Sequence, residues 1–478
     1  MITFCVAIAL LILGYFLYGK FVASHFNIDP SRKTPAYAQQ DGVDYTPMPT
    51  WRVFVIQFLN IAGLGPIFGA VTGAAFGPAA FIWIVVGCIF MGATHDFVAG
   101  MMSVRNEGLN VPDIAGKYVS RQFKWFMNFV AFFLLLAVGV SFVIGPTGLL
   151  AEMTGWDKSL WLFIIFGYYI TATVLPVDKL IGNIYPFMGA ALLFMAIGVG
   201  IMMLVGDING THQIPELTLS TLKNYHREPD TNIMIPMMFI VISCGAISGF
   251  HATQSTMMAR CLKNEKHARP VFYGAMIAEG IVAMIWAAAA IAYFGGPEGL
   301  NAQMAAGRDS ASLVKEICQS WLGQAGAIIA IIGVVVCPIT SGDTAFRSLR
   351  LILADSFKVN QKPILNRILL AAPLFAVAYF FCKVDFQTAW NYLGIANQTL
   401  ACLVLWTGAA YLINKGKPHW ICSIPATFLT FVCACFLMVS PIGFKMAPMV
   451  GYIVGAVAAL TAFSFCVVKG SKRGTSSL

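Results

Sequence analysis

Long apolar stretches recur along the whole chain and leave few folds open to it. Thirteen of them are long enough to cross a bilayer, namely 2–18, 51–72, 79–102, 125–145, 159–175, 184–205, 233–258, 270–294, 322–340, 364–381, 386–413, 419–438 and 446–468. In lipid, the backbone polar groups of such a stretch must pair within a helix. Charged residues make up only 11% of the 478 residues, against roughly 25% in soluble proteins. The sequence therefore predicts an all-α polytopic membrane protein with about thirteen transmembrane helices.

Positive charges are unevenly divided between the segments that join these stretches. If the N-terminus lies outside, 23 of the 30 lysines and arginines fall in cytoplasmic segments. Cytoplasmic loops carry an excess of these residues, so the sequence predicts an external N-terminus and a cytoplasmic C-terminus. The net charge of +9 then follows from topology and from contact with anionic membrane lipid. It does not indicate a nucleic-acid partner.

A cluster of helix-breaking residues interrupts the second apolar stretch. Pro66 has no N–H to donate, and its ring clashes with the carbonyl of Ala62 one turn earlier. An unwound segment in mid-membrane offers carbonyls to a cation and amides to an anion, although a packing kink would give the same pattern. The functional interpretation predicts that a substrate contacts Gln57, Asn60, Ala62, Gly63, Gly65 and Pro66.

A similar interruption lies five stretches later, within 233–258. Two glycines stand there among small and hydroxyl residues in an otherwise apolar run. The charge distribution predicts that this stretch crosses the membrane in the opposite direction to the first broken one. Broken helices at matching positions in oppositely oriented halves indicate a transporter built as an inverted repeat. The residues predicted to complete the substrate site are Ser243, Cys244, Gly245, Ser248, Gly249 and His251.

Several ionisable and hydroxyl side chains lie inside apolar stretches, where a charge is costly unless it is paired or hydrated. Such residues carry protons or bind coupling cations in transporters. The alternative is structural: Asp96 would then fix a helix end or pair with a nearby basic residue, and Asp343 would pair with Arg347 or Arg350. The residues predicted for ion or proton coupling are His95, Asp96, Glu279, Thr340, Ser341 and Asp343.

Six motifs together identify a family that this chain resembles. They are Asp41-Gly42-Val43-Asp44-Tyr45, Ile61-Ala62-Gly63-Leu64-Gly65-Pro66, Gly92-Ala93-Thr94-His95-Asp96-Phe97, the run 244–251, the run 340–347 and Ala396-Asn397-Gln398-Thr399. With these, the chain resembles the carbon starvation family of peptide and pyruvate transporters over most of residues 40–413. Longer members of the family carry a His-His pair where this chain has Ile56-Gln57, so it is similar to the shorter branch.

The resemblance implies a bacterial inner-membrane importer with the five-plus-five inverted repeat of the amino acid–polyamine–cation superfamily. The first and sixth helices of that core are expected to be broken. Residues 1–50 would then form an anchor helix and a cytoplasmic loop, 51–413 the ten-helix core, and 414–478 two further helices and a basic tail. Sodium-coupled relatives imply a sodium site at Ala62, Thr340 and Ser341.

The expected function is secondary transport of a small carboxylate-bearing nutrient, either a short peptide or amino acid, or pyruvate. Uptake would be coupled to protons or sodium, and no other cofactor is expected. The alternatives are a membrane-embedded redox or haem enzyme and a non-transporting nutrient receptor. The seven histidines are dispersed, and the twelve cysteines contain no Cys-x-x-Cys pair, which argues against the redox alternative. The substrate, the coupling ion and the oligomeric state are left open by the sequence.

Overall fold

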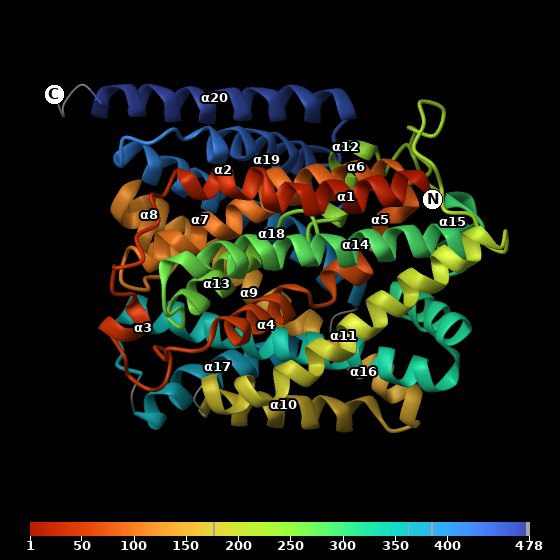
Figure 1. The fold of residues 1–478 in the computed structure, drawn as a ribbon, viewed down its shortest axis with the longest axis horizontal. Coiled ribbons are helices and arrows are strands. Elements are labelled where there is room, and N and C mark those ends of the chain that lie inside the picture. The colour runs from red at the N-terminus through yellow and green to blue at the C-terminus, as the bar shows by residue number, and fades with distance from the viewer. Residues whose placement is uncertain (175–176, 362, 384–385, 475–478) are drawn as a thin grey trace.

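The fold comes from a computed structural model, which describes residues 1–174, 177–361, 363–383 and 386–474. Most of the described chain is helical, and many of its long helices run along the long axis of the molecule (Figure 1). The N-terminus and the C-terminal end of α20 (Pro448–Gly474) lie at opposite ends of that axis (Figure 1). An odd number of membrane crossings requires such an arrangement.

The number of helices that could span a membrane differs from the thirteen predicted. Ten helices of the described chain are long and apolar enough, and one bent pair makes an eleventh span. The difference lies at 159–175, where the helix has only 17 residues and residue 175 lies outside the described part. It also lies at 233–258, which is divided into helices of 8 and 11 residues. The number of spanning helices is therefore two below the number of apolar stretches, because one stretch forms a short helix and the other is divided by a break.

The first half of the core contains the predicted break. Helix α4 ends at Ile61, Ala62 leaves helical geometry with φ −80° and ψ 38°, and the following helices are bent by 50° from α4. In chain order this part of the protein comprises α1 (Ile2–Phe16), α2 (Tyr18–Ser24), α3 (Pro35–Ala38), α4 (Thr50–Ile61), η1 (Gly65–Gly69), α5 (Ala70–Gly73), η2 (Ala74–Phe76), α6 (Ala79–Val86), η3 (Gly87–Gly92), α7 (Ala93–Val104), α8 (Val111–Tyr118), α9 (Arg121–Thr154), α10 (Lys158–Val174) and α11 (Val177–Ile208).

The second half contains the other break. Helix α12 ends at Val241, and α13 begins only at Gly249. The elements of this half and of the C-terminal region are α12 (Met234–Val241), α13 (Gly249–Ala259), η4 (Glu265–His267), η5 (Arg269–Tyr273), α14 (Gly274–Tyr293), α15 (Pro297–Ala305), α16 (Ser310–Phe357), α17 (Ile364–Phe381), α18 (Phe386–Asn414), α19 (Trp420–Val439) and α20. Both spans are therefore interrupted, as the sequence predicts.

The two halves pack against each other around these breaks. Helix α13 lies on α7, α16 lies on α9, and α14 contacts both α4 and η1. Glycines on the helix after the first break allow this close approach. A Cβ on Gly73 would lie 2.0 Å from Cγ1 of Ile242, and one on Gly69 would lie 3.0 Å from the carbonyl oxygen of Val241. Gly69 and Gly73 of the first broken span therefore allow it to pack closely against the second broken span.

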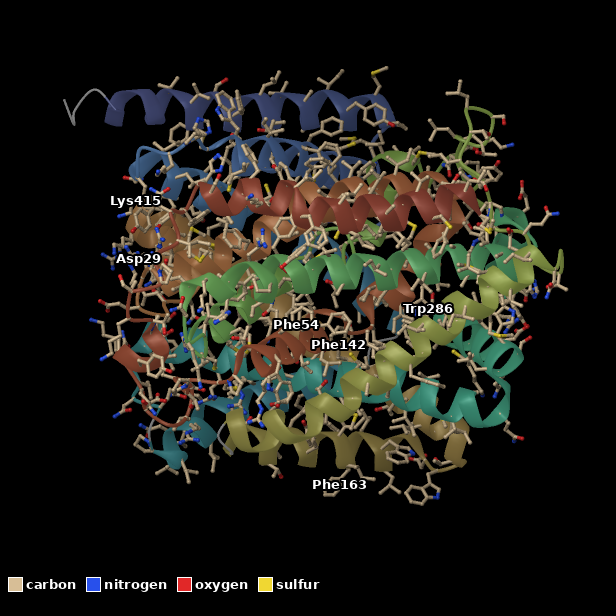
Figure 2. The ribbon with its side chains drawn as sticks, viewed as in Figure 1. Asp29, Phe54, Phe142, Phe163, Trp286 and Lys415 are labelled. Atoms are coloured by element: carbon tan, nitrogen blue, oxygen red, sulfur yellow. The ribbon has the colours of Figure 1, made fainter. Side chains whose placement is uncertain are left out.

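The outer surface is apolar along the sides of the bundle. Phe163 points away from the other helices at the edge of the molecule and is 76% exposed (Figure 2). Leu369 and Leu460, on α17 and α20, are similarly exposed. Exposed large apolar side chains in such numbers mark a surface that contacts lipid.

The loop 26–50 closes one end of the bundle. Asp29, in this loop, and Lys415, after α18, lie at this end (Figure 2). Below the surface, Nη1 of Arg347 lies 3.8 Å from Oδ1 of Asp44, and both side chains are buried. An ion pair therefore ties this loop to α16.

Candidate functional site

The two breaks lie directly against each other in the interior. A Cβ placed on Gly65 would lie 2.1 Å from the Cβ of Cys244, and one placed on Gly245 would lie 3.8 Å from Cα of Pro66. Phe142 of α9, in the middle of the bundle (Figure 2), covers the first break at Gly63. The residues that were predicted from two distant stretches thus meet at one place.

Helices α14 and α6 hold the second break in its unwound form. Gly245 has φ +89°, a conformation that residues with a Cβ rarely adopt, and its amide donates to Oε1 of Glu279 at 3.0 Å. The indole of Trp83 donates to the carbonyl of Ile242 at 2.9 Å. Two of the backbone groups freed by the break are therefore paired with side chains of neighbouring helices.

A chain of four buried ionisable side chains begins at Glu279. Nε2 of His251 lies 3.4 Å from Oε2 of Glu279, and Nδ1 of His251 lies 3.1 Å from Oδ2 of Asp96. The other oxygen of Asp96 lies 2.8 Å from Nδ1 of His95. All four side chains are 0% exposed. The four residues come from α7, α13 and α14, and we call them the His–Asp–His–Glu chain.

The chain has the chemistry of a proton carrier. A carboxylate between two imidazoles accepts a hydrogen bond from each Nδ1–H. Unless the His251 ring is doubly protonated, its Nε2 then carries no hydrogen and can only accept a hydrogen bond. Nε2 then faces Oε2 of Glu279, and neither atom has a hydrogen-bond partner among the described residues. Two acceptors at this distance call for a shared proton or another cation between them.

A second cluster lies where α16 crosses the end of α4. The thiol of Cys337 donates to the carbonyl oxygens of Leu59 and Ala62 at 3.2 and 3.1 Å. The hydroxyl of Ser341 lies 3.4 Å from the Leu59 oxygen, and that of Thr340 donates to the Cys337 carbonyl at 2.7 Å. Carbonyl and hydroxyl oxygens of this kind suit a hard monovalent cation. The structure thus places Ser341 beside the first break near Ala62, whereas the Thr340 hydroxyl bonds within α16.

Other predicted residues pair between helices. Nε2 of Gln57 donates to Ser255 on α13 at 3.0 Å, and Oδ1 of Asn60 accepts from Thr344 on α16 at 3.0 Å. Gly249 lies against α18, where a Cβ would come within 2.4 Å of the Asn397 carbonyl oxygen. The predicted substrate residues therefore divide into those at the facing breaks and those that fix the helices around them.

Asp343 lies apart from the His–Asp–His–Glu chain. It is fully buried on α16, and neither carboxylate oxygen has a hydrogen-bond partner in the described part of the protein. Arg347 follows it one turn later on the same helix and pairs with Asp44. Asp343 therefore forms part of a separate charged group towards the closed end of the bundle.

Asn397 of α18 fixes the start of α13. Its Oδ1 accepts hydrogen bonds from the Ser248 hydroxyl and the Phe250 amide, each at 3.0 Å. In the sequence, Asn397 stood out as part of a family motif, which did not predict that its side chain holds the second break. A side chain at this position satisfies an amide at a helix N-terminus that would otherwise be orphaned.

Two substitutions of Asn397 distinguish its hydrogen bond to the start of α13 from a contribution of packing alone. We expect Asn397→Leu to lower the stability by about 1–3 kcal/mol, because it leaves the Phe250 amide buried without a partner. Asn397→Asp keeps the acceptor oxygen and should unfold closer to the wild type. Thermal unfolding of the purified protein measures both, and equal melting temperatures for the two variants would contradict this role.

Sequence reasoning missed Leu59, Cys337 and Asn397. Cys337 precedes Thr340 and Ser341 by three and four residues, so it shares their face of α16, and this spacing was a usable signal. Leu59 contributes only its backbone oxygen. The identity of its side chain therefore gave no indication of its role.

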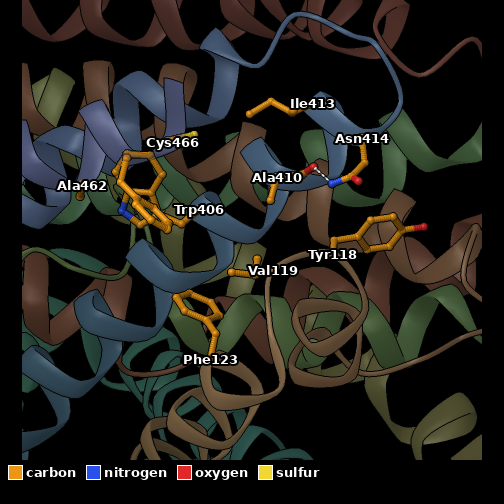
Figure 3. A pocket seen from close by; sticks show the side chains of 10 residues that line it. Tyr118, Val119, Phe123, Trp406, Ala410, Ile413, Asn414, Ala462 and Cys466 are labelled. Carbon is orange, nitrogen blue, oxygen red and sulfur yellow. Dashed lines mark hydrogen bonds between the residues drawn. The ribbon is translucent and has the colours of Figure 1, made fainter. Parts of the chain in front are cut away.

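Two cavities differ in their relation to the breaks. One, of about 950 Å³, lies between α9, α10 and α16 and reaches Phe68 of η1 just beyond the first break. The other, of about 190 Å³, is apolar and lies between α18 and α20, with Trp406 and Cys466 on its wall (Figure 3). Neither cavity is lined by a predicted site residue, but Phe68 of the first lies only two residues beyond Pro66 in the chain.

Comparison with known protein families gives a match over most of the chain. The family described as "Carbon starvation protein CstA" matches residues 1–144, 127–325 and 298–435. An uncharacterised membrane protein of Haemophilus influenzae is 43% identical over 64% of this chain and 95% of its own length. The peptide transporter CstA of Campylobacter jejuni is 25% identical over 88% and 78% of the two chains. The pyruvate/proton symporter BtsT of Escherichia coli is 26% identical over 83% and 64%.

Solved transporters share the fold at low sequence identity. The manganese transporter of Eremococcus coleocola is 11% identical, with a TM-score of 0.58 over 91% of this chain and 99% of its own. The nucleobase-cation-symport-1 family transporter Mhp1 is 15% identical, with a TM-score of 0.54 over 93% and 96%. A Na⁺-coupled sialic acid symporter is 12% identical, with a TM-score of 0.52 over 95% and 96%. The predicted inverted-repeat transporter fold is thereby confirmed.

Proposed function

Because the chain belongs to the carbon starvation CstA family, we propose that it is a secondary transporter that imports a small carboxylate-bearing nutrient. Its relatives are named as transporters of peptides and of pyruvate with protons, so the candidates are a short peptide, an amino acid or pyruvate. The protein is a multi-pass membrane protein, and we place its N-terminus outside the bacterial inner membrane and its C-terminus in the cytoplasm. The charge distribution supports this orientation.

We propose that the substrate binds where the two breaks face each other. The backbone amides around Gly63 and Gly65 would receive its carboxylate, as helix N-termini do in broken-helix transporters. The amide of Gly245 is already paired with Glu279, so it would contribute only after Glu279 releases it. The polar residues Ser243 and Ser248 beside the break would set specificity.

Alternating access would open this site to one side at a time. The cavity at Phe68 leads outward in the proposed orientation, while the ion pair of Arg347 with Asp44 closes the cytoplasmic end. We therefore propose that the described conformation faces outward. Inward opening would require α16 to release the loop 26–50.

The observation that carries the proposal of proton coupling is the His–Asp–His–Glu chain. It joins the second break, through the Gly245 amide, to α7 by way of four buried ionisable side chains. A proton on Glu279 or His251 would change the bond that holds Gly245. Proton binding and the shape of the substrate site are thus linked in the proposed mechanism.

Sodium is the second candidate coupling ion, and the cluster at Cys337 favours it. The oxygens of Ala62, Thr340 and Ser341 would hold the ion, with the carbonyl oxygen of Leu59 completing the set. Bound sodium would supply positive charge that ties α16 to the end of α4. Asp343, two residues beyond Ser341 on the same helix, would offset part of that charge.

Uptake by reconstituted protein tests the proposal. Proteoliposomes are given radiolabelled dipeptides, amino acids or pyruvate, with and without sodium, at two pH values. We expect accumulation of one substrate class that depends on an imposed proton gradient, or on sodium if the second candidate is right. Protein-free liposomes are the control, and no uptake of any of these classes above that control would overturn the proposal.

A further inference from the structure

Three side chains with metal-binding atoms converge at the second break. Cys244 lies in the break, His251 lies on α13, and Glu279 lies on α14. One ligand atom from each lies within 4.8 Å of the other two. His251 and Glu279 are fully buried, whereas Cys244 is partly exposed. Three protein ligands with one open side are typical of a site that can take a further ligand.

Two of these ligand atoms already have the separation that a tetrahedral metal requires. Metal–nitrogen and metal–oxygen bonds of about 2.1 Å place the two ligands about 3.4 Å apart. Nε2 of His251 and Oε2 of Glu279 lie 3.4 Å apart, and neither has a hydrogen-bond partner among the described residues. Two buried acceptors that face each other are stabilised by a cation between them.

Asp96 orients His251 as the outer carboxylate of a metal site does. Its Oδ2 lies 3.1 Å from Nδ1 of His251, which directs Nε2 towards Glu279. In metalloproteins a metal-binding histidine commonly donates its other N–H to a carboxylate in this way. The outer partner of the site is therefore present as well as the ligands.

We propose that Cys244, His251 and Glu279 bind a thiophilic divalent metal ion such as Zn²⁺. A thiolate, an imidazole and a carboxylate together prefer Zn²⁺ to sodium, magnesium or calcium. The two negative ligands neutralise the charge of the ion, which lowers the cost of burying it. Cys244 is the ligand that borders Gly65, so the metal would lie where the two breaks meet.

Occupation of this site has a consequence for transport. The metal would take the position between His251 and Glu279 that a coupling proton needs, and it would tie the second break to α14. We expect bound zinc to arrest uptake. This consequence rests on the proposed function, whereas binding of the metal does not.

Direct metal binding tests the site without any transport assay. The purified full-length protein is treated with a chelator and titrated with Co²⁺, and a thiolate-to-cobalt charge-transfer band reports a cysteine ligand. Zinc content is then measured after gel filtration. We expect one zinc ion per chain and a cobalt band in the wild type. Cys402→Ser, which changes a buried cysteine of α18, is the matched control and should keep both signals.

Ligand variants decide the assignment. We expect Cys244→Ser to lose the charge-transfer band, and His251→Gln and Glu279→Gln to weaken metal binding by about tenfold or more. If either glutamine variant does not fold, the comparison of Cys244→Ser with Cys402→Ser still decides. No stoichiometric binding by the wild type, or a band that survives Cys244→Ser, overturns the proposal.

Uptake with added zinc separates the two proposals. Zinc that binds but does not slow uptake contradicts the expected arrest and leaves the metal site in place. If the protein binds zinc but transports nothing when zinc is absent, only the proposed function is contradicted. We expect uptake by the wild type and by Cys402→Ser to stop when zinc is added and to resume when it is chelated.

Discussion

Asp96→Asn is expected to abolish concentrative uptake in proteoliposomes while substrate exchange across the same membranes continues. Asparagine has the size of aspartate, and its amide can still accept from one neighbouring imidazole and donate to the other. It cannot hold the negative charge that stabilises a protonated His251, whose Nδ1 lies 3.1 Å from Oδ2 of Asp96. The substrate would therefore still cross, but without a coupled proton it would only reach equal concentrations on the two sides.

The controls for this prediction use other carboxylates of the chain. Asp113, which pairs with Lys124 at 2.5 Å, lies on the short helix α8 away from the breaks, so Asp113→Asn should accumulate substrate normally. Asp343→Asn distinguishes proton coupling from sodium coupling. Asp343 lies on α16 near the proposed sodium ligands, so this variant should lose accumulation if sodium is the coupling ion. Accumulation at the wild-type level by Asp96→Asn would remove the His–Asp–His–Glu chain from the mechanism.

Gly65→Ala is expected to lower both the stability of the protein and its uptake rate. The added Cβ would lie 2.1 Å from the Cβ of Cys244 and 2.3 Å from its sulfur, so the two breaks must separate. Overpacking of this kind costs about 1–3 kcal/mol. The separation also widens the place where the substrate binds in our proposal, so the uptake rate should fall with the melting temperature.

A second substitution should relieve the clash. In Gly65→Ala/Cys244→Gly the nearest remaining atom would be Cα of residue 244 at 3.6 Å, which is ordinary contact. We expect the double variant to recover much of the lost stability, with an interaction energy of roughly 0.5–3 kcal/mol in a double-mutant cycle. Gly167→Ala is the matched control, since nothing lies within 4 Å of a Cβ there. Equal melting temperatures for Gly65→Ala and Gly167→Ala would show that the breaks do not touch.

Individual residues show where sequence reasoning stopped. His95 and Asp96 stood out because charge inside an apolar run is costly. Their partner His251 was predicted for the substrate site instead, and only the fold places it between Asp96 and Glu279. Cys244 was predicted as a substrate contact among scattered buried cysteines, and its closeness to two other metal-binding side chains was not apparent from spacing.

The sequence by itself determined the membrane class, the two helix breaks and the family. These follow from local chemistry, because hydropathy and the loss of a helical hydrogen bond at proline depend on neighbouring residues along the chain. Only the tertiary structure decided which groups meet. Glu279 and Gly245 are 34 residues apart, and Asp96 and His251 are 155 apart. Such contacts depend on the packing of several helices, which no local pattern specifies.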